Sequence, residues 1–441
     1  MVCIEVPSSK SEVHRLLIAA ALCDGDVDVE YKGESEDIRA TKRCLKALRN
    51  GDRDLYVGES GSTLRFMLAV AGALGARVTF HMEGRLPERP LEPYDEELMA
   101  HGLDIHKEGS LLYVRGKLKA GEYRLPGNVS SQYVTGLLLA LPILEGESRI
   151  FVTAPIESAP YIDITTDVLD MSGIVYSKTE TAEGICYEIP GGQTYRLPQV
   201  VKAEGDYSAA AFWMCLGAIT EDGIRVSGLN MSSSQGDRKV VEILRDFGAS
   251  VTELEDGYVV KGGMLKGTVV DASQVPDLVP ALAVVAACLA GRTDFVSAAR
   301  LRLKESDRIR STAAMVRAFG ADADELPDGI VITGRGAQAT APGAPADAFA
   351  SETDVDHDDA TLGASIAGAT ESASGARQPL APRLKGGCVV DSYGDHRIAM
   401  AAGIASVVAD GEVTITDKGC VAKSYPGFWE DLDEYLSRKN H

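Results

Sequence analysis

The most constraining feature of the sequence is a pattern that recurs about six times along the chain. Each copy has a loop rich in Ser and Gly, an apolar helix rich in small residues, and then Gly followed by a β-type run. The apolar helices are predicted to begin at Ser11, Gly61, Ser130, Tyr207, Pro276 and Asp395. A single unit of this kind cannot bury its apolar face, so the copies must pack against one another.

Amphipathic helices fall between the apolar ones, so the repeating unit reads β-α-β-α-β-β, of about 65 to 75 residues. The predicted fold class is therefore α/β (α+β). The variable unit length and the absence of a strict motif favour two globular groups of three units over a solenoid. A Gly/Pro-rich run near Ala203 marks the crossover. We predict an N-terminal domain over 10–202 and a C-terminal domain formed by 1–9 and 203–441.

Composition changes within the last unit, from about 336 to 385. This segment is rich in Ala, Gly, Ser, Pro, Asp and Thr and has few large apolar residues. Such a stretch cannot bury enough apolar surface to offset its ordering entropy. We predict a disordered, low-complexity insertion.

The formal net charge of −21 argues against nucleic-acid binding, because phosphate contacts need a basic surface. No window reaches the ~20 apolar residues of a membrane span. The start of the chain lacks the layout of a secretory signal. We therefore expect a cytoplasmic protein without a membrane or nucleic-acid partner, and the acidic surface favours a monomer.

Cationic residues gather at helix starts and in short polar loops, where free backbone N–H groups and the helix dipole already favour anions. The residues are Lys10, Arg15, Arg65, Arg89, Lys304, Arg308, Arg397 and Lys423. One such residue would mean only capping or solvation, but eight in equivalent places suit small ligands with several carboxylates and phosphates. No P-loop and no metal-ligand spacing is present, so neither a metal nor a cofactor is expected.

Acids lie among these cations. Asp307 and Asp395 are read as structural partners of nearby bases. Asp277 follows Pro276 at an apolar helix start with no basic neighbour in sequence, so a general-base role is open. The Ser130-Ser131-Gln132 group fits a phosphate and hydroxyl receptor, and it fits a helix cap equally well.

Eleven short motifs resemble the signatures of EPSP synthases, which are members of the enolpyruvyl transferase family. The motifs occur in the family's order and cover nearly the whole chain outside the insertion. They are PSSKSEVHR, VGESGSTLR, GRLPERP, GNVSSQY, SAPYIDIT, EGDYSAAAF, SSSQGD, VPDLVPALA, RLKESDRI, YGDHRIAMA and CVAKSYPGFW. The resemblance implies two similar domains of three units each, an inside-out α/β barrel of the EPT/RTPC-like type. It also implies transfer of the enolpyruvyl group of phosphoenolpyruvate to the 5-hydroxyl of shikimate 3-phosphate.

Carried over by motif, the resemblance implies a set of ligand contacts. Shikimate 3-phosphate would meet Lys10, Ser11, Arg15, Ser130, Ser131, Gln132, Ser158, Asp277 and Lys304. Phosphoenolpyruvate would meet Lys10, Gly61, Arg65, Arg89, Gln132, Arg308, Arg397 and Lys423. The catalytic set would be Asp277, Glu305, Lys423 and Lys10.

The resemblance also suggests roles. Asp277 would deprotonate the attacking hydroxyl, and Glu305 with Lys423 would move the proton at the methylene carbon. A lysine in such a cationic crowd is expected to have a lowered pKa. Two positions depart from the family pattern: Ser9 replaces a glycine, which is tolerated if the turn does not require positive φ, and Arg300 replaces a polar amide.

Two other functions compete with this one. The related transferase that acts on UDP-N-acetylglucosamine usually has Lys-Asn where this chain has Lys10-Ser11, and a Cys in a loop that here reads GRLPERP. A non-catalytic anion-binding homologue would be expected to lose acids before cations, yet Asp277 and Glu305 remain. The resemblance also implies inhibition by glyphosate, which occupies the phosphoenolpyruvate place in this family, because Gly61 should leave room that a larger side chain would fill.

Overall fold

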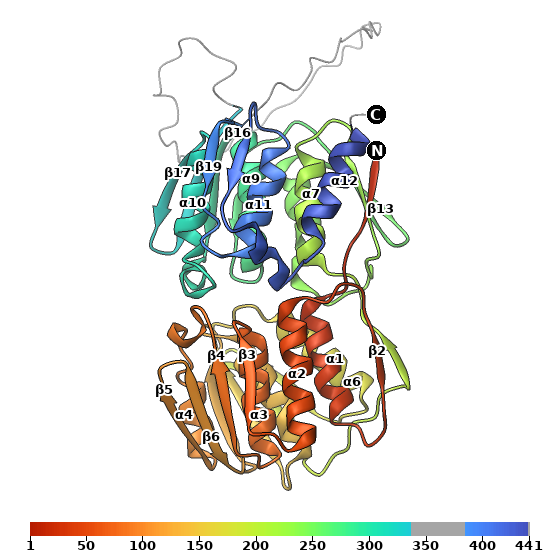
Figure 1. The fold of residues 1–441 in the computed structure, drawn as a ribbon, viewed down its shortest axis with the longest axis vertical. Helices are drawn as coiled ribbons and strands as arrows, with labels where there is room; N and C mark the ends of the chain where they lie inside the picture. Colours follow the sequence, from red (N-terminus) through yellow and green to blue (C-terminus); the bar gives the residue numbers. More distant parts are fainter. Residues whose placement is uncertain (337–383, 440–441) are drawn as a thin grey trace, which may run out of the picture.

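The computed structural model describes residues 1–336 and 384–439 and has two halves, each built on its own hydrophobic core (Figure 1). The core of the first half runs from Val13 to Ala203. The core of the second half joins Val2, Ile4 and Val6 to residues from 207 to 435. The chain therefore starts in the second half, crosses to the first, and returns. Apart from its ends, the predicted insertion over 336–385 lies outside the described residues.

The first half follows the alternating order that the repeat predicts. Its elements are α1 (Lys10–Ala21), β2 (Asp28–Glu30), α2 (Glu36–Asn50), β3 (Asp54–Gly58), α3 (Gly61–Ala73), β4 (Val78–Met82), α4 (Tyr94–Ala100), β5 (Leu103–Glu108), β6 (Leu111–Gly116), β7 (Glu122–Pro126), α5 (Ser131–Ala140), β8 (Ser148–Thr153), α6 (Pro160–Met171), β9 (Ser177–Thr181), β10 (Gly184–Ile189) and β11 (Val200–Lys202).

The second half repeats this order and adds short 3-10 helices near the site. Its elements are β1 (Val2–Glu5), α7 (Tyr207–Ala218), β12 (Ile224–Ser227), η3 (Gly236–Lys239), α8 (Val240–Phe247), β13 (Ser250–Leu254), β14 (Gly257–Lys261), β15 (Val269–Asp271), η4 (Pro276–Leu278), α9 (Val279–Cys288), β16 (Ala290–Val296), η5 (Ala299–Leu303), α10 (Arg308–Ala318), β17 (Asp322–Leu326), β18 (Gly329–Arg335), β19 (Cys388–Val390), α11 (His396–Ser406), β20 (Val413–Ile415), η6 (Lys418–Lys423) and α12 (Phe428–Lys439).

Four sheets share one topology, in which a parallel pair is followed by two antiparallel pairings. Their strand orders are β3-β4-β6-β5, β7-β8-β10-β9, β1-β12-β14-β13 and β15-β16-β18-β17. Two further sheets, β11-β2 and β19-β20, have only two parallel strands among the described residues. The α/β fold class is confirmed, but only four of the six predicted units carry the complete β-α-β-α-β-β sheet in the described part of the chain.

The apolar helices lie inside because they have no polar face to expose. All ten residues of α9 are buried, and in α7 every residue except Ser208 is buried. Burying one large apolar side chain stabilises the fold by about 1.5–3 kcal/mol, so exposing such a helix would cost far more than its propensity supplies. Helix α8 is amphipathic instead, and ends at Gly248, whose φ of 96° suits glycine.

The two crossings of the chain lie side by side and bring the start of α1 next to the start of α7. The Ser9 N–H donates to the Glu204 carbonyl at 2.7 Å, and the Asp206 N–H donates to the Pro7 carbonyl at 2.9 Å. Ser9 has a φ of −57°, so this turn does not need the family's glycine. Among residues 1–336 and 384–439, every helix is too short or too polar to span a bilayer.

Candidate active site

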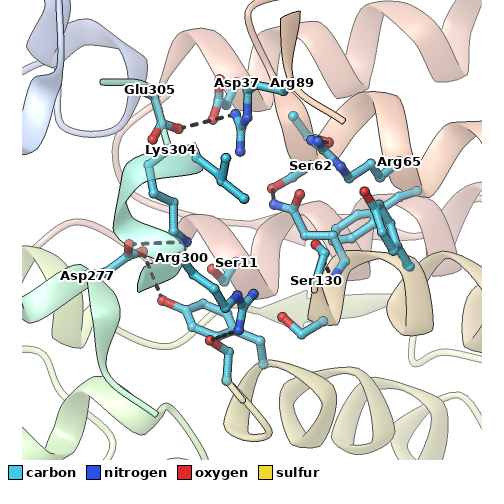
Figure 2. A pocket seen from close by; sticks show the side chains of 18 of the residues that line it. Ser11, Asp37, Ser62, Arg65, Arg89, Ser130, Asp277, Arg300, Lys304 and Glu305 are labelled. Carbon is cyan, nitrogen blue, oxygen red and sulfur yellow. Dashed lines mark hydrogen bonds and ion pairs between the residues drawn. The ribbon is translucent and has the colours of Figure 1, made fainter. Parts of the chain in front are cut away.

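A cavity lies between the two halves, at the N-terminal ends of several helices, and fifteen of the sixteen predicted site residues line it (Figure 2). They are Lys10, Ser11, Arg15, Gly61, Arg65, Arg89, Ser130, Ser131, Gln132, Ser158, Asp277, Lys304, Glu305, Arg308 and Arg397. The exception is Lys423, which lies at the end of η6 and is not among the lining residues. Segments up to 387 residues apart in sequence, from Lys10 to Arg397, thus meet at one place.

The cavity is strongly cationic although the chain as a whole is acidic. Its lining holds eight Lys and Arg side chains against three Asp and Glu side chains. The net charge of the chain is −21, so the cavity lining has the opposite sign of charge to the chain as a whole. A cleft of one sign between low-dielectric walls concentrates the field and attracts ligands of the opposite sign. The helix N-termini add their own positive dipole ends.

Asp277 lies at the centre of an ion-pair cluster. Its carboxylate oxygens accept hydrogen bonds from Arg308 Nη1 and Arg397 Nη2, each at 2.7 Å, and from the Tyr161 hydroxyl at 3.0 Å. Lys304 Nζ lies 3.8 Å from Oδ1. Burial alone would raise the pKa of this carboxyl, but Arg397, Lys304 and Arg308 outweigh burial and hold that pKa well below its usual range. The basic neighbours that are missing from the local sequence are supplied by the fold.

Glu305 joins the two halves. Its carboxylate accepts from Arg308 Nη2 at 2.7 Å and lies 3.7 Å from Arg89 Nη1 of the first half. The Arg85 side chain also donates to the Glu305 carbonyl at 3.1 Å. Burial opposes ionisation of Glu305, but Arg308, Arg89 and Lys423 together hold its pKa well below the usual range. Glu305 is therefore ionised in the structure as it stands.

The expected lowering of a lysine pKa occurs at Lys304 and not at Lys423. Burial, reinforced by nearby arginines, lowers the pKa of Lys304 to about 8. The prediction was wrong for Lys423. Burial works against its charge, but Glu305, Asp37 and Glu59 raise its pKa above the usual value. Lys423 Nζ donates to Glu59 Oε2 at 3.1 Å, which links the two halves. These three acids lie at least 118 residues from Lys423 in the chain, so the local sequence does not predict them.

Lys10 lies at the start of α1 and is held there by Asp37, which lies in the first turn of α2. The Lys10 Nζ donates to Asp37 Oδ2 at 2.8 Å, and the side chains are 16% and 7% exposed. A second contact fixes the backbone, because the Lys10 N–H donates to Asp206 Oδ2 at 3.0 Å. The ammonium group is thus aimed into the cavity from a rigid helix start.

Ser130 caps a helix, which is one of the two uses that the sequence left open, and it also lines the cavity. Its hydroxyl accepts from the Gln132 N–H at 3.3 Å and caps α5, and the side chain also lines the cavity. The Gln132 amide donates to Ser62 Oγ at 2.9 Å, which ties the start of α5 to that of α3. These polar groups from two helix starts face one space in Figure 2.

Gly61 begins α3 beneath two guanidinium groups. A Cβ atom at this position would lie 2.7 Å from Arg65 Nη1 and 2.8 Å from Arg89 Nη1. Arg65 is fixed by its hydrogen bonds to the Gly61 carbonyl at 3.3 Å and the Pro90 carbonyl at 3.1 Å. Only glycine lets these cations approach the helix start so closely.

Several cavity residues were not singled out from the sequence, although the quoted motifs contain most of them. They are Asp37, Ser62, Phe66, Pro90, Val129, Tyr133, Tyr161, Leu303 and His396. His396 is buried, and neither ring nitrogen has a hydrogen-bond partner in the described part of the chain. Burial, with Lys10 and Arg397, lowers its pKa well below the usual value. A neutral imidazole therefore faces the cavity.

The described residues contain no cluster of three or more His, Cys, Asp or Glu side chains suited to hold a metal ion. The cavity has the excess of positive charge that anionic ligands require, and Asp277 and Glu305 are its ionised acids.

Comparisons with known proteins fit this geometry. The sequence profile of the EPSP synthase (3-phosphoshikimate 1-carboxyvinyltransferase) family matches residues 49–350 and 360–432. The chain belongs to the EPSP synthase family. A 3-phosphoshikimate 1-carboxyvinyltransferase from Clostridium kluyveri is 38% identical over 97% of this chain and 93% of the relative. The enzyme of the same name from Clostridium acetobutylicum is 36% identical over 98% and 94%.

Solved structures agree with the sequence comparison. An EPSP synthase from Acinetobacter baumannii superposes with a TM-score of 0.72 at 27% identity, covering 98% of this chain and 95% of that one. The enolpyruvyl transferase NikO from Streptomyces tendae shares the fold, with a TM-score of 0.68 at 13% identity over 98% and 94%. The predicted resemblance and the two-half architecture of the EPSP synthase family are confirmed.

Proposed function

We propose that this chain transfers the enolpyruvyl group of phosphoenolpyruvate to the 5-hydroxyl of shikimate 3-phosphate and releases phosphate. The observation that carries the proposal is the single cavity in which cations of both halves surround the ionised acids Asp277 and Glu305. Two substrates that carry several negative charges match this excess of positive charge. The family membership supports the same reaction.

The reaction needs no covalent nucleophile from the protein. The 5-hydroxyl adds to C2 of phosphoenolpyruvate while a proton joins its methylene carbon, which gives a tetrahedral intermediate. Loss of a proton from that carbon then expels phosphate. We assign Asp277 to the hydroxyl proton and Glu305 with Lys423 to the proton at carbon, and Lys10 stabilises the developing charge. Polar donors fixed at helix starts are suited to such charge stabilisation because they need no reorganisation.

Substrate sites follow from which half supplies each group. The acceptor lies against α1, α5 and α6, where Ser11, Arg15, Ser130, Ser131 and Ser158 gather. Phosphoenolpyruvate lies between Gly61 with Arg65 and Arg89 on one side and Arg308 with Arg397 on the other. Asp277 and Lys304 contact the acceptor from the second half, and Lys423 contacts phosphoenolpyruvate. Lys10 and Gln132 contact both substrates.

The domain boundaries and the assembly state belong to the same proposal. The two cores support division into 10–202 and into 1–9 with 203–441. We propose that the chain acts as a cytoplasmic monomer on these two small molecules, without a nucleic-acid partner.

Phosphate release tests the proposal. Purified protein receives phosphoenolpyruvate with shikimate 3-phosphate in one reaction and with UDP-N-acetylglucosamine in a second. We expect release in the first reaction only. The Asp277→Asn variant should reduce turnover by about 10²–10⁴-fold, as is typical of acid–base residues. Release only in the second reaction, or in neither, would refute the proposed function.

A further inference from the structure

One unit of the first half lacks a pair of strands that the complete units have. Helices α4, α6, α8 and α10 are each followed by two antiparallel strands, which complete a four-stranded sheet. Helix α2 ends at Asn50 instead, and the next strand, β3, begins at Asp54 and belongs to the neighbouring sheet. The sheet β11-β2 therefore keeps only its first two strands, and β2 lies at the right-hand side of the first half in Figure 1.

Strand β2 has a free edge as a result. It pairs with β11 along one side, whereas its counterpart β4 pairs with β3 on one side and with β6 on the other. The Asp28 N–H donates to the Gln199 carbonyl, and the Glu30 carbonyl accepts from the Ala203 N–H. The backbone groups of Val29, between them, point the opposite way. In the described part of the chain that edge has no strand partner, so it is a template for another strand.

An apolar groove of about 730 Å³ lies beside the free edge, between β2, α1 and α2. Several of its apolar lining residues are only partly buried: Leu17, Leu22, Val27, Val29, Leu45 and Leu48. In the complete unit next to it, Val78, Phe80 and Met82 of β4 are at most 4% exposed. There the hairpin strand β6 pairs with β4 and buries its own Leu112 and Val114. The groove is thus a place that a hairpin covers elsewhere in the same chain.

The two rims of the groove carry opposite charges. The cations of the lining all come from α2: Lys42, Arg43, Lys46 and Arg49. The acids of the lining come from β2 and the turn before it: Asp24, Asp26 and Asp28. Asp28 and Glu30 of β2 and Lys46 of α2 are exposed and have no ion pair among the described residues. These groups are therefore free to pair with an occupant of the groove.

We infer that this groove binds a β-hairpin of a partner protein, which completes the β11-β2 sheet. The inference does not depend on the proposed function. The hairpin places alternate apolar side chains into the groove, because successive side chains of a strand point to opposite faces. Its strand beside β2 carries Lys or Arg on the outer face, opposite Asp28 and Glu30, and its second strand carries acids on the side of Lys46.

A second copy of this chain is a poorer occupant. The same face of another copy is hollowed as well, so it cannot fill the groove. Pairing of two β2 edges would also set Asp28 and Glu30 of one copy against the same acids of the other, and like charges across a ladder are destabilising. A small apolar molecule would leave the backbone groups of Val29 unused.

A synthetic hairpin tests the inference with the whole chain. One strand of this probe alternates Val with Lys, the other alternates Val with Glu, and an Asn-Gly turn joins them. Its ends are cyclised, because an isolated hairpin is marginally stable. The comparison probe has the same composition and turn with the alternation scrambled. Calorimetry should show that the alternating probe binds at least about tenfold more tightly, and hydrogen exchange should slow over 27–31 when it binds.

Charge reversal on β2 identifies the place of binding. Asp28→Lys combined with Glu30→Lys should weaken the alternating probe by about 5–30-fold, equivalent to about 1–2 kcal/mol, because two attractive cross-strand pairs become repulsive. The matched control is Asp322→Lys combined with Asp324→Lys, which reverses two exposed acids at alternate positions of β17. This control should bind the probe like the wild type. Circular dichroism checks that both variants stay folded.

Equal binding of the two probes would overturn the inference, and so would unchanged binding after charge reversal on β2. Equal weakening by the two double variants would also overturn it, because the probe would then respond to net charge and not to the groove. Sedimentation of the wild-type chain as a dimer that the β2 variant dissociates would show an interface between copies instead. All of these results are independent of phosphate release, so they are distinct from failure of the proposed function.

Discussion

Replacing Gly61 by Ala tests how closely the cations must approach the start of α3. The new Cβ would lie 2.7 Å from Arg65 Nη1 and 2.8 Å from Arg89 Nη1, whereas ordinary contact begins at 3.4 Å. The shortfalls are therefore 0.7 and 0.6 Å. Arg65 is 3% exposed and bound to two carbonyls, so it cannot swing away. Arg89 has a single ion pair in the described residues, at 3.7 Å to Glu305, and must move instead.

A displaced Arg89 would lose the alignment with the anionic groups of phosphoenolpyruvate that we propose for it. A hydrogen bond to a charged group is worth about 1.5–3 kcal/mol, which corresponds to about 10–100-fold in affinity. We therefore expect Gly61→Ala to raise the KM for phosphoenolpyruvate by this factor and to weaken inhibition by glyphosate comparably. The KM for shikimate 3-phosphate should change by less than about threefold, because its contacts lie elsewhere.

Steady-state phosphate release with each substrate varied in turn measures both constants. Gly25→Ala is the control, because a Cβ at Gly25 meets nothing within 4 Å. If Gly61→Ala behaves like this control, then Arg89 is not positioned by the glycine and the reasoning fails. Equal weakening of both substrates would also refute it, since that would indicate a general distortion of the site.

Three further predictions concern charge. Glu59→Gln removes the carboxylate 3.1 Å from Lys423, so the pKa of Lys423 should fall. The alkaline limb of the pH profile of kcat should then shift to lower pH. An unchanged limb would show that Lys423 takes no part in proton transfer. Because the pKa of Lys304 is about 8, the KM for shikimate 3-phosphate should rise as the pH increases above 8, and a constant KM up to pH 9.5 would contradict a charged Lys304 contact. Burial and repulsion by Glu204 raise the pKa of Glu12 to about 7, so the folded protein keeps a proton that the unfolded chain loses. The free energy of unfolding should therefore fall from pH 4.5 to 7, and Glu12→Gln should reduce this fall in urea unfolding; equal slopes for both proteins would refute the assignment.

The fold was predictable because its strongest signal is local. An apolar helix such as α9 or α7 has no polar face, so its burial follows from composition alone. Helix starts were predictable within a few residues, because Ser60 and Asp206 are typical N-cap residues. Their side chains accept hydrogen bonds from the backbone N–H groups three residues further on. The two-stranded sheets β11-β2 and β19-β20 were not, because strand pairing depends on partners distant in sequence.

The site was predictable where a residue's type sufficed, and not where its neighbours decide its chemistry. Arg308 and Arg397 were found as cations at helix starts. Both arginines pair with Asp277, which lies 31 residues from Arg308 and 120 residues from Arg397 in the chain. The local sequence could not predict these pairings. The same limit explains the wrong sign for the pKa of Lys423, whose acid partner Glu59 is 364 residues away. Long-range ion pairing leaves no periodic trace in a sequence.

The ion pairs of Asp277 give the proposed reaction a built-in order. In the structure the carboxylate is held by Arg308 and Arg397, and its pKa is too low for an effective base. These two arginines are also the proposed ligands of phosphoenolpyruvate. When the anion engages them, their charge is shared and the pKa of Asp277 must rise. On this proposal Asp277 becomes a competent base only after the donor is bound, and deprotonation of the acceptor hydroxyl is then coupled to the presence of the group that the hydroxyl will attack.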